Sequence, residues 1–306
     1  SPAPTLTLAA VLGRFDESPF TTTDYRPELM EFDPDTGTTQ TALALWGANA
    51  PAYPNRITNL AWGPEGTRLA LTALERNDRA TLYVYDVPSG NMQPIIPAAA
   101  AWTALSRPAW SRAGDWLLLA GRSAAHPGGQ ILRVDPADGT AEEIAPGWAP
   151  DFFGTDARLV YWHAGEVIEH DIISDETRIL ATDVDAVAAL AADPAGERIA
   201  FSHAGGLFVW DGAEPRSLYA TPSPARLDAL VWSTAGILIV ENRPPGETEA
   251  GYSRVLRLQP ADDSPRIDIM VERRYDPLPD DPRQFTAVAP QPRGAFVPPR
   301  EDGNTL

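Results

Sequence analysis

The side chains with the widest chemical range in this chain are four histidines, because the sequence contains no cysteine. His163 and His203 occupy the same place in two similar stretches, WHAGEV and SHAGGL. Such a histidine could act as a general base or as a metal ligand. However, a residue that recurs together with the same short Gly-containing turn is more typical of a repeated turn than of a catalyst. We therefore interpret both residues as structural.

The other two histidines, His126 and His170, form no ligand pattern. The sequence has no His-x-x-x-His pair and no other zinc-binding spacing. It also lacks the Gly-x-Ser-x-Gly, phosphate-loop, dinucleotide-binding and EF-hand motifs. We predict that the protein has no catalytic residues, no metal site and no cofactor.

A recurring aspartate invites a calcium or paired-carboxylate interpretation. It closes an apolar run in five similar stretches, and Gln259 takes its place in a sixth; the five are Asp33, Asp86, Asp135, Asp171 and Asp211. An Asp that begins a β-turn accepts a hydrogen bond from the backbone two residues on, and DPDTG and DPADG have the composition of such turns. Because the five lie in separate repeats, we predict turn formers and not one shared site.

The charge of the chain excludes several kinds of partner. It has 24 basic and 42 acidic residues, a formal net charge of −18, which repels nucleic-acid phosphates and anionic membrane surfaces. The longest largely apolar stretch, residues 94–105, is too short to span a bilayer and is interrupted by Pro97. We predict no nucleic-acid binding and no membrane span. A start at Ser1 is compatible with a mature exported protein or with a shortened chain, and with an anchoring segment that this chain does not include.

These residues belong to a repeated frame of short strands. Five stretches have a strand, a turn and a second apolar strand; they begin at residues 57, 105, 149, 187 and 227. Six further hairpins follow the same pattern and begin at residues 28, 81, 130, 166, 207 and 255. Four short strands in roughly 40 to 50 residues is the spacing of a β-propeller blade.

The sequence has six outer hairpins but only five complete inner hairpins. The first blade therefore lacks its innermost strand. The stretch FTAVAPQPRGAFV (285–297) matches the inner hairpin ITNLAWGPEGTRL in its apolar spacing. We predict an all-β fold, a six-bladed β-propeller closed by a C-terminal strand that completes the first blade. The predicted propeller covers residues 1–297, with blades at about 5–45 plus 285–290, 57–96, 105–145, 149–181, 187–220 and 227–271; a flexible tail follows at 298–306.

Tryptophan recurs on the first strand of three units, at Trp62, Trp110 and Trp232. Burial of each ring between blades contributes about 1.5–3 kcal/mol. We interpret these rings as core and not as a sugar-stacking platform.

The stretches PAWSRAGDWLLLAG and QILRVDPADG resemble the repeats of TolB-like and WD-repeat-like six-bladed propellers, and the resemblance extends over about residues 5–297. It implies an exported protein, in the periplasm or at the cell surface, that binds a protein partner, such as a subunit of an envelope complex. Phe153 and Ala192 depart from the pattern, because other copies have Trp there.

Long loops cluster in neighbouring units. The connections between second and third strands are long in the first, second, third and sixth blades, at 13–28, 74–80, 121–129 and 241–254. These four blades are consecutive in a closed ring, and loops longer than a fold requires tend to carry function. Arg and Tyr are enriched at interface hot spots. The residues we expect to bind are Arg14, Phe15, Phe20, Tyr25, Arg76, Arg122, Arg243 and Tyr252. The alternative is that each Arg pairs with a nearby carboxylate such as Glu75 or Glu241.

The sequence therefore favours a non-catalytic binding or assembly module, working through this sector of one face. A permanent structural subunit of an envelope assembly is a related alternative. The other alternative is a propeller enzyme, such as a lactonase, hydrolase or lyase, with its site at the central channel. Such sites need converging acids, histidines or metal ligands, whereas the predicted inner strands are poor in acids, with Asp193 and Asp228 as exceptions.

Overall fold

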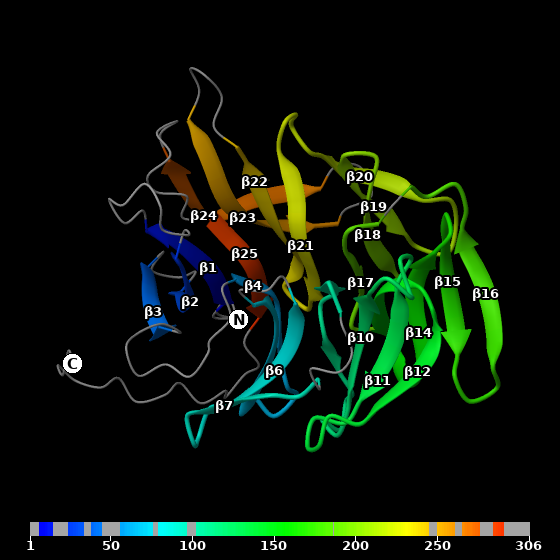
Figure 1. Cartoon of the computed structure of the whole chain (residues 1–306). Helices are drawn as coiled ribbons and strands as arrows, with labels where there is room; N and C mark the ends of the chain where they lie inside the picture. The colour runs from blue at the N-terminus through cyan, green and yellow to red at the C-terminus, as the bar shows by residue number, and fades with distance from the viewer. Residues whose placement is uncertain are drawn as a thin grey trace.

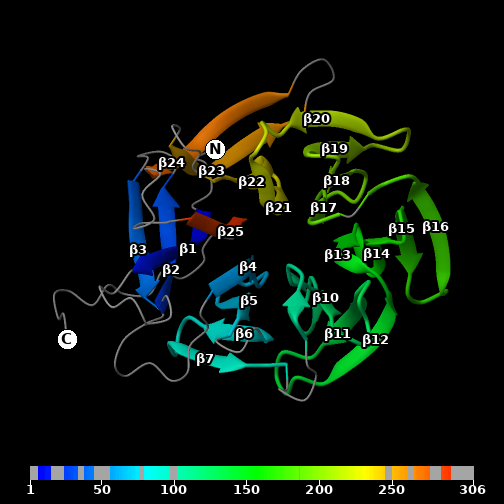
Figure 2. The same cartoon turned by 45° about the horizontal axis from the view of Figure 1, so that its top comes forward.

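The computed structural model describes residues 6–14, 24–33, 38–44, 56–75, 79–96, 102–185, 187–244, 250–260, 265–275 and 284–290. Within these ranges all regular structure is β, in 25 strands that form six sheets. The sheets stand around a central axis as the blades of a propeller, with the first strand of each blade innermost (Figures 1 and 2). The predicted six-bladed all-β fold is confirmed. The tail predicted at 298–306 lies outside the described residues.

The blades follow the chain in order. Blade 1 consists of β25 (Gln284–Pro290), β1 (Leu6–Arg14), β2 (Asp24–Asp33) and β3 (Thr38–Ala44). Blade 2 consists of β4 (Arg56–Trp62), β5 (Arg68–Leu74), β6 (Ala80–Asp86) and β7 (Asn91–Pro94). Blade 3 consists of β8 (Ala104–Leu105), β9 (Ala109–Trp110), β10 (Leu117–Arg122), β11 (Gln130–Val134) and β12 (Ala141–Pro146).

Blade 4 consists of β13 (Trp148–Phe153), β14 (Thr155–His163), β15 (Glu166–Asp171) and β16 (Glu176–Ala181). Blade 5 consists of β17 (Leu190–Ala192), β18 (Ile199–His203), β19 (Gly206–Trp210) and β20 (Arg216–Ala220). Blade 6 consists of β21 (Arg226–Ser233), β22 (Gly236–Arg243), β23 (Gly251–Gln259) and β24 (Arg266–Tyr275).

The two ends of the chain meet in blade 1. β25 pairs antiparallel with β1, with Leu6 opposite Pro290 and Leu8 opposite Val288. In Figure 2 the red β25 lies beside the blue β1, next to the axis. The predicted closure by residues 285–290 is confirmed, because this strand gives β1 the inner partner that no upstream segment provides.

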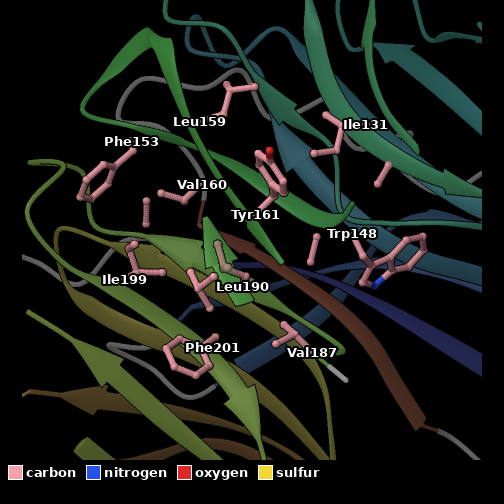
Figure 3. Close-up of a cluster of buried hydrophobic side chains, with 14 of the residues drawn as sticks. Ile131, Trp148, Phe153, Leu159, Val160, Tyr161, Val187, Leu190, Ile199 and Phe201 are labelled. Carbon is pink, nitrogen blue, oxygen red and sulfur yellow. The ribbon is translucent and has the colours of Figure 1, made fainter. Parts of the chain in front are cut away.

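The position of a strand in its blade explains its composition. Middle strands such as β5, RLALTAL, are buried throughout their centre because neighbouring blades cover both faces. The outermost strand β16 exposes its first four residues to solvent. Between the blades, Ile131, Tyr161 and Leu190 belong to one buried cluster that extends over blades 3, 4 and 5 (Figure 3).

Three of the repeated aspartates, Asp86, Asp135 and Asp171, are turn formers. Asp211 instead lies 3.6 Å from Arg216 Nε, and the turn after Asp33 lies outside the described residues. Asp135 Oδ1 accepts a hydrogen bond from Ala137 N at 2.8 Å, and Asp171 Oδ1 accepts one from Ile173 N at 2.9 Å. Hydrogen bonds from Ser89 lower the pKa of Asp86, and those from the backbone of Ser174 and Ile173 lower the pKa of Asp171. The prediction made for these turns is confirmed.

The two similar histidines also lie at turns, as predicted. His203 ends β18, and the two residues that follow it have φ values of 47° and 74°. Positive φ at both central positions defines the tight hairpin turn that suits the twist of the strands. His203 Nδ1 accepts a hydrogen bond from Asp185 N at 3.0 Å. His163 precedes an equivalent turn, with φ values of 49° and 92°.

Two of the recurring tryptophans are wedged between blades as expected. Trp110 is 9% exposed, and its Nε1 donates to the backbone oxygen of Ala61 in blade 2 at 3.0 Å. The Arg68 guanidinium lies 4.7 Å from the centre of the Trp110 ring, and Arg198 lies 5.0 Å from that of Trp232. In both cases an arginine covers the tryptophan of the next blade; Arg68 begins the second strand of its blade, and Arg198 directly precedes the second strand of its own. The similar stretches TRLAL and ERIAF contain Arg68 and Arg198 at the same position, and this repetition is the sequence signal from which the contact could have been predicted.

Candidate binding face

The long connections and the entrance of the channel lie on the same face of the ring. In every blade the first and second strands are antiparallel, so the first strand begins where the second one ends; for example, Leu105 pairs with Gly121 in blade 3. The loop from the second to the third strand leaves from that same end. We call this side of the ring the mouth face. Figure 2 shows blades 6, 1, 2 and 3 in succession around the axis.

The structure describes the backbone of five of the eight predicted binding residues. Phe15, Phe20 and Arg76 lie outside the described residues. The backbone of Arg14 pairs with that of Asp24, and Gly13 pairs with Tyr25, at the mouth end of blade 1.

The loops predicted at 13–28 and 241–254 are longer than the actual connections. β1 extends to Arg14 and β2 begins at Asp24, while β22 extends to Arg243 and β23 begins at Gly251. Arg243 and Tyr252 are therefore paired strand residues and not loop residues, and the Arg243 guanidinium lies 6.0 Å from the centre of the Tyr252 ring. The mouth end of this hairpin contains a buried polar cluster.

That cluster is centred on Glu241, which is fully buried. Its carboxylate accepts hydrogen bonds from the hydroxyls of Tyr219 and Tyr252 and from Arg254 Nε, the last at 2.8 Å. Tyr219 comes from blade 5, so the cluster joins blades 5 and 6. Glu241 thus pairs with Arg254. Glu75, which directly follows β5 in blade 2, accepts hydrogen bonds from Thr81 and Tyr83.

The ionisation of Tyr252 gives a testable pH dependence. Burial, followed by the hydrogen bond to Glu241 and its negative charge, raises the pKa of Tyr252 from 10.0 to about 12. A pKa raised in the folded state means that folding favours the neutral phenol. This stabilisation is complete below pH 10 and is lost as the pH rises from 10 towards about 12. We expect the urea midpoint of unfolding to fall across that window, and to fall less steeply in Tyr252→Phe. An equal slope in both proteins would contradict this assignment.

Arg122 is the predicted binding residue with the most unusual surroundings. It ends β10, and its guanidinium stacks 3.9 Å from the centre of the Trp148 ring of blade 4. Its Nε is buried with no hydrogen-bond partner, and burial lowers the pKa of the guanidinium. None of the ion pairs between described residues includes it. Desolvation without a carboxylate makes Arg122 a favourable place for an external anionic group.

A cavity of about 150 Å³ lies at the entrance of the channel, and we call it the mouth cavity. Its lining comes from the beginnings of the inner strands and includes Asn59, Arg107, Trp148 and Asp228. Trp148 is also the ring under Arg122, so this predicted binding residue lies at the rim of the channel.

A second cavity of about 360 Å³, the far cavity, lies towards the other ends of the inner strands. Its lining is more aromatic and includes Trp62, Trp110, Phe152 and Trp232.

Arg107 lines both cavities and is held by an interblade ion pair. It lies between β8 and β9, where Pro108 cannot donate to the ladder and the inner strand of blade 3 is interrupted. Its Nη2 is 2.6 Å from Asp151 Oδ2 of blade 4, and the same oxygen accepts a hydrogen bond from Ala192 N of blade 5 at 3.1 Å. The sequence contains no signal for this pair, because Arg107 and Asp151 lie in repeated stretches whose other copies have no charged residue at the corresponding positions.

The described part of the chain contains no group of three or more histidine, aspartate or glutamate residues placed to hold a metal ion. His170 is buried on β15, with its Nε2 3.0 Å from Asp175 Oδ1. A search of the described residues for a helix long and apolar enough to span a membrane found none.

Comparison with known proteins establishes the fold. No protein-family model matches the sequence, and neither does any curated protein. TolB from Acinetobacter baumannii superimposes with a TM-score of 0.63 at 15% identity, over 95% of this chain and 67% of that one. This chain has the TolB-like propeller fold. A protein described as a TolB from Agrobacterium tumefaciens gives a TM-score of 0.60 at 12% identity, over 94% of both chains.

The TolB-like fold is also similar to a chain in the structure of a nidogen/laminin complex. The TM-score is 0.59 at 13% identity, over 93% of this chain and 97% of that one. At these identities the likeness shows the TolB-like architecture alone.

Proposed function

We propose that this TolB-like propeller is a non-catalytic protein-binding module that works outside the cytoplasm, as an assembly component of the cell envelope. The observation that carries the proposal is Arg122, a desolvated guanidinium stacked on Trp148 at the mouth face, with no carboxylate of the described residues paired to it. Arg243 against Tyr252 adds a second arginine–aromatic pair in the same sector. Aromatic residues and arginine are the usual anchors of protein interfaces.

The structural neighbours support the same role. One similar chain comes from a complex of nidogen with laminin, so a propeller of this shape occurs in a protein–protein complex. The resemblance to TolB-like repeats supports the proposed export. We take residues 1–297 as a single binding domain, with Arg14, Phe15, Phe20, Tyr25, Arg76, Arg122, Arg243 and Tyr252 as its contact residues.

Replacement of Arg14, Arg76, Arg122 and Arg243 together by alanine tests this proposal. We expect partner recovery from the native envelope to fall by about tenfold or more, because several interface anchors are lost. The measurement is affinity purification followed by cross-linking mass spectrometry with a carboxylate-reactive reagent, since the chain has no lysine. The expected cross-links involve residues 13–28 or 241–254.

The matched control replaces Arg133, Arg178, Arg216 and Arg266, which lie on β11, β16, β20 and β24 in the halves of these strands that are remote from the mouth face. It makes the same change in charge away from the mouth face and should retain the partner. Full retention by the mouth-face variant, or the absence of any protein partner, would refute the proposal.

A propeller enzyme with its site at the channel is the second candidate. The far cavity favours it, because about 360 Å³ is within the usual size range of ligand sites. Elemental analysis of native protein is the test, since a stoichiometric divalent metal would support the enzyme over the binding module.

A further inference from the structure

The mouth cavity combines two opposite charges that the proposed loop interface does not use. Arg107 of blade 3 and Asp228 of blade 6 are the charged residues among those that line it. Both belong to inner strands or their interruptions, so they face the channel and not the outer surface of the ring. A polar cavity with one cation and one anion in its wall is complementary to a ligand that carries both charges.

Arg107 retains hydrogen-bonding capacity. One guanidinium has five N–H donors. The ion pair with Asp151 at 2.6 Å fixes the side chain, yet Arg107 Nε is buried with no hydrogen-bond partner. A planar guanidinium held in this way is suited to a second carboxylate.

Asp228 likewise retains acceptor capacity. Its Oδ2 accepts a hydrogen bond from Asn242 Nδ2 at 2.6 Å, and its Oδ1 is 2.9 Å from Arg226 Nε. The side chain of Arg226 is 61% exposed, so this ion pair is screened by solvent and neutralises Asp228 only in part. A carboxylate offers about four acceptor positions, which leaves room for an ammonium group.

The rest of the lining limits the size and character of the ligand. Thr58 Oγ1 lies 2.9 Å from Thr72 Oγ1, and Asn59 Nδ2 donates to Thr72 Oγ1 at 3.0 Å, so these polar groups are fixed by one another. Apolar residues complete the wall, both small ones such as Ala149 and Ala188 and larger ones such as Leu190. A volume of about 150 Å³ equals that of an engineered cavity that binds benzene. The ligand is therefore a small molecule.

We propose that the mouth cavity binds a small zwitterion of the α-amino acid type, with its carboxylate at Arg107 and its ammonium group at Asp228. The net charge of −18 disfavours a simple anion, whereas a zwitterion enters without net repulsion. This site goes beyond the protein partner proposed above and does not depend on it.

Isothermal titration of the full chain with each standard L-amino acid tests the proposal. We expect at least one to bind saturably at one site. N-acetyl-L-amino acid and L-amino acid amide forms of that ligand should each bind about tenfold more weakly or worse, because each loses one charge-assisted contact. No binding of any standard amino acid at about 10 mM, or equal binding of the N-acetyl form, would overturn the proposal.

The variant Asp228→Asn removes the negative charge while it preserves the shape of the side chain. We expect about tenfold weaker zwitterion binding, with the N-acetyl form unaffected. The matched control is Asp268→Asn, an acid of β24 that pairs with Arg257 at 2.7 Å outside the cavity. Wild-type affinity in Asp228→Asn, or an equal loss in Asp268→Asn, would overturn the assignment. The comparison of ligand analogues needs no variant, so it decides the proposal even where Asp228→Asn fails to fold.

Discussion

Replacement of Glu241 by alanine is expected to lower the free energy of unfolding by about 3–5 kcal/mol. Glu241 is fully buried and neutralises Arg254, whose Nη2 lies 2.7 Å from its Oε1. Without it, Arg254 keeps the distant contact of Nη1 with Glu272 at 3.7 Å and the hydrogen bond from Nη2 to the neutral Tyr219 hydroxyl at 3.2 Å. The hydroxyls of Tyr219 and Tyr252 lose the carboxylate to which they donate. Urea unfolding followed by tryptophan fluorescence measures the loss.

The matched control for this change is Glu272→Ala. This substitution removes the same charge from the same cluster. However, the Glu272 side chain is 21% exposed and also pairs with Arg274. We expect a loss of about 1 kcal/mol or less, as for other solvent-accessible ion pairs. If Glu241→Ala proved no more destabilising than Glu272→Ala, the Glu241 cluster would not be what holds blades 5 and 6 together.

Replacement of Val288 by aspartate is expected to cost about 4 kcal/mol or more, because it places a charge in an apolar contact with no partner. Val288 lies on the closing strand β25 and is 1% exposed. It packs with Met30 and Phe32 of blade 1 and with Val231 and Val240 of blade 6. The substitution therefore acts at the one place where the two ends of the chain close the ring.

The same substitution at Ile179 is the control. Ile179 is 54% exposed on the outermost strand β16, so Ile179→Asp should cost about 1 kcal/mol or less. Thermal and urea unfolding of the two variants give the comparison. Equal stabilities would show that closure by β25 contributes little to the fold.

Much of the fold was predictable from local patterns. The stretch at 285–297 resembles the inner hairpins, and the first blade lacked an inner strand, so the pairing of β25 with β1 could be predicted before the structure was known. The turns at Asp135 and Asp171 were predictable because an Asp at the start of a β-turn bonds its own backbone.

The candidate site was less predictable. The sequence predicts a loop at Arg243 and Tyr252 because Pro and Gly residues lie between them. In the structure, however, the paired strands continue as far as these two residues. Their extension accompanies the contact of Glu241 with Tyr219 of the neighbouring blade, which leaves no mark on the periodicity of blade 6.

The sequence by itself determined the number of blades, their turns and the closure of the ring, because each depends on residues that are near in sequence or that repeat. The tertiary structure alone decided which charges meet. Arg107 pairs with Asp151, and Arg107 shares a cavity with Asp228, across blades that are separated by one or more repeats. Contacts of this kind depend on how whole blades pack around the axis, and no local propensity or periodicity records that packing.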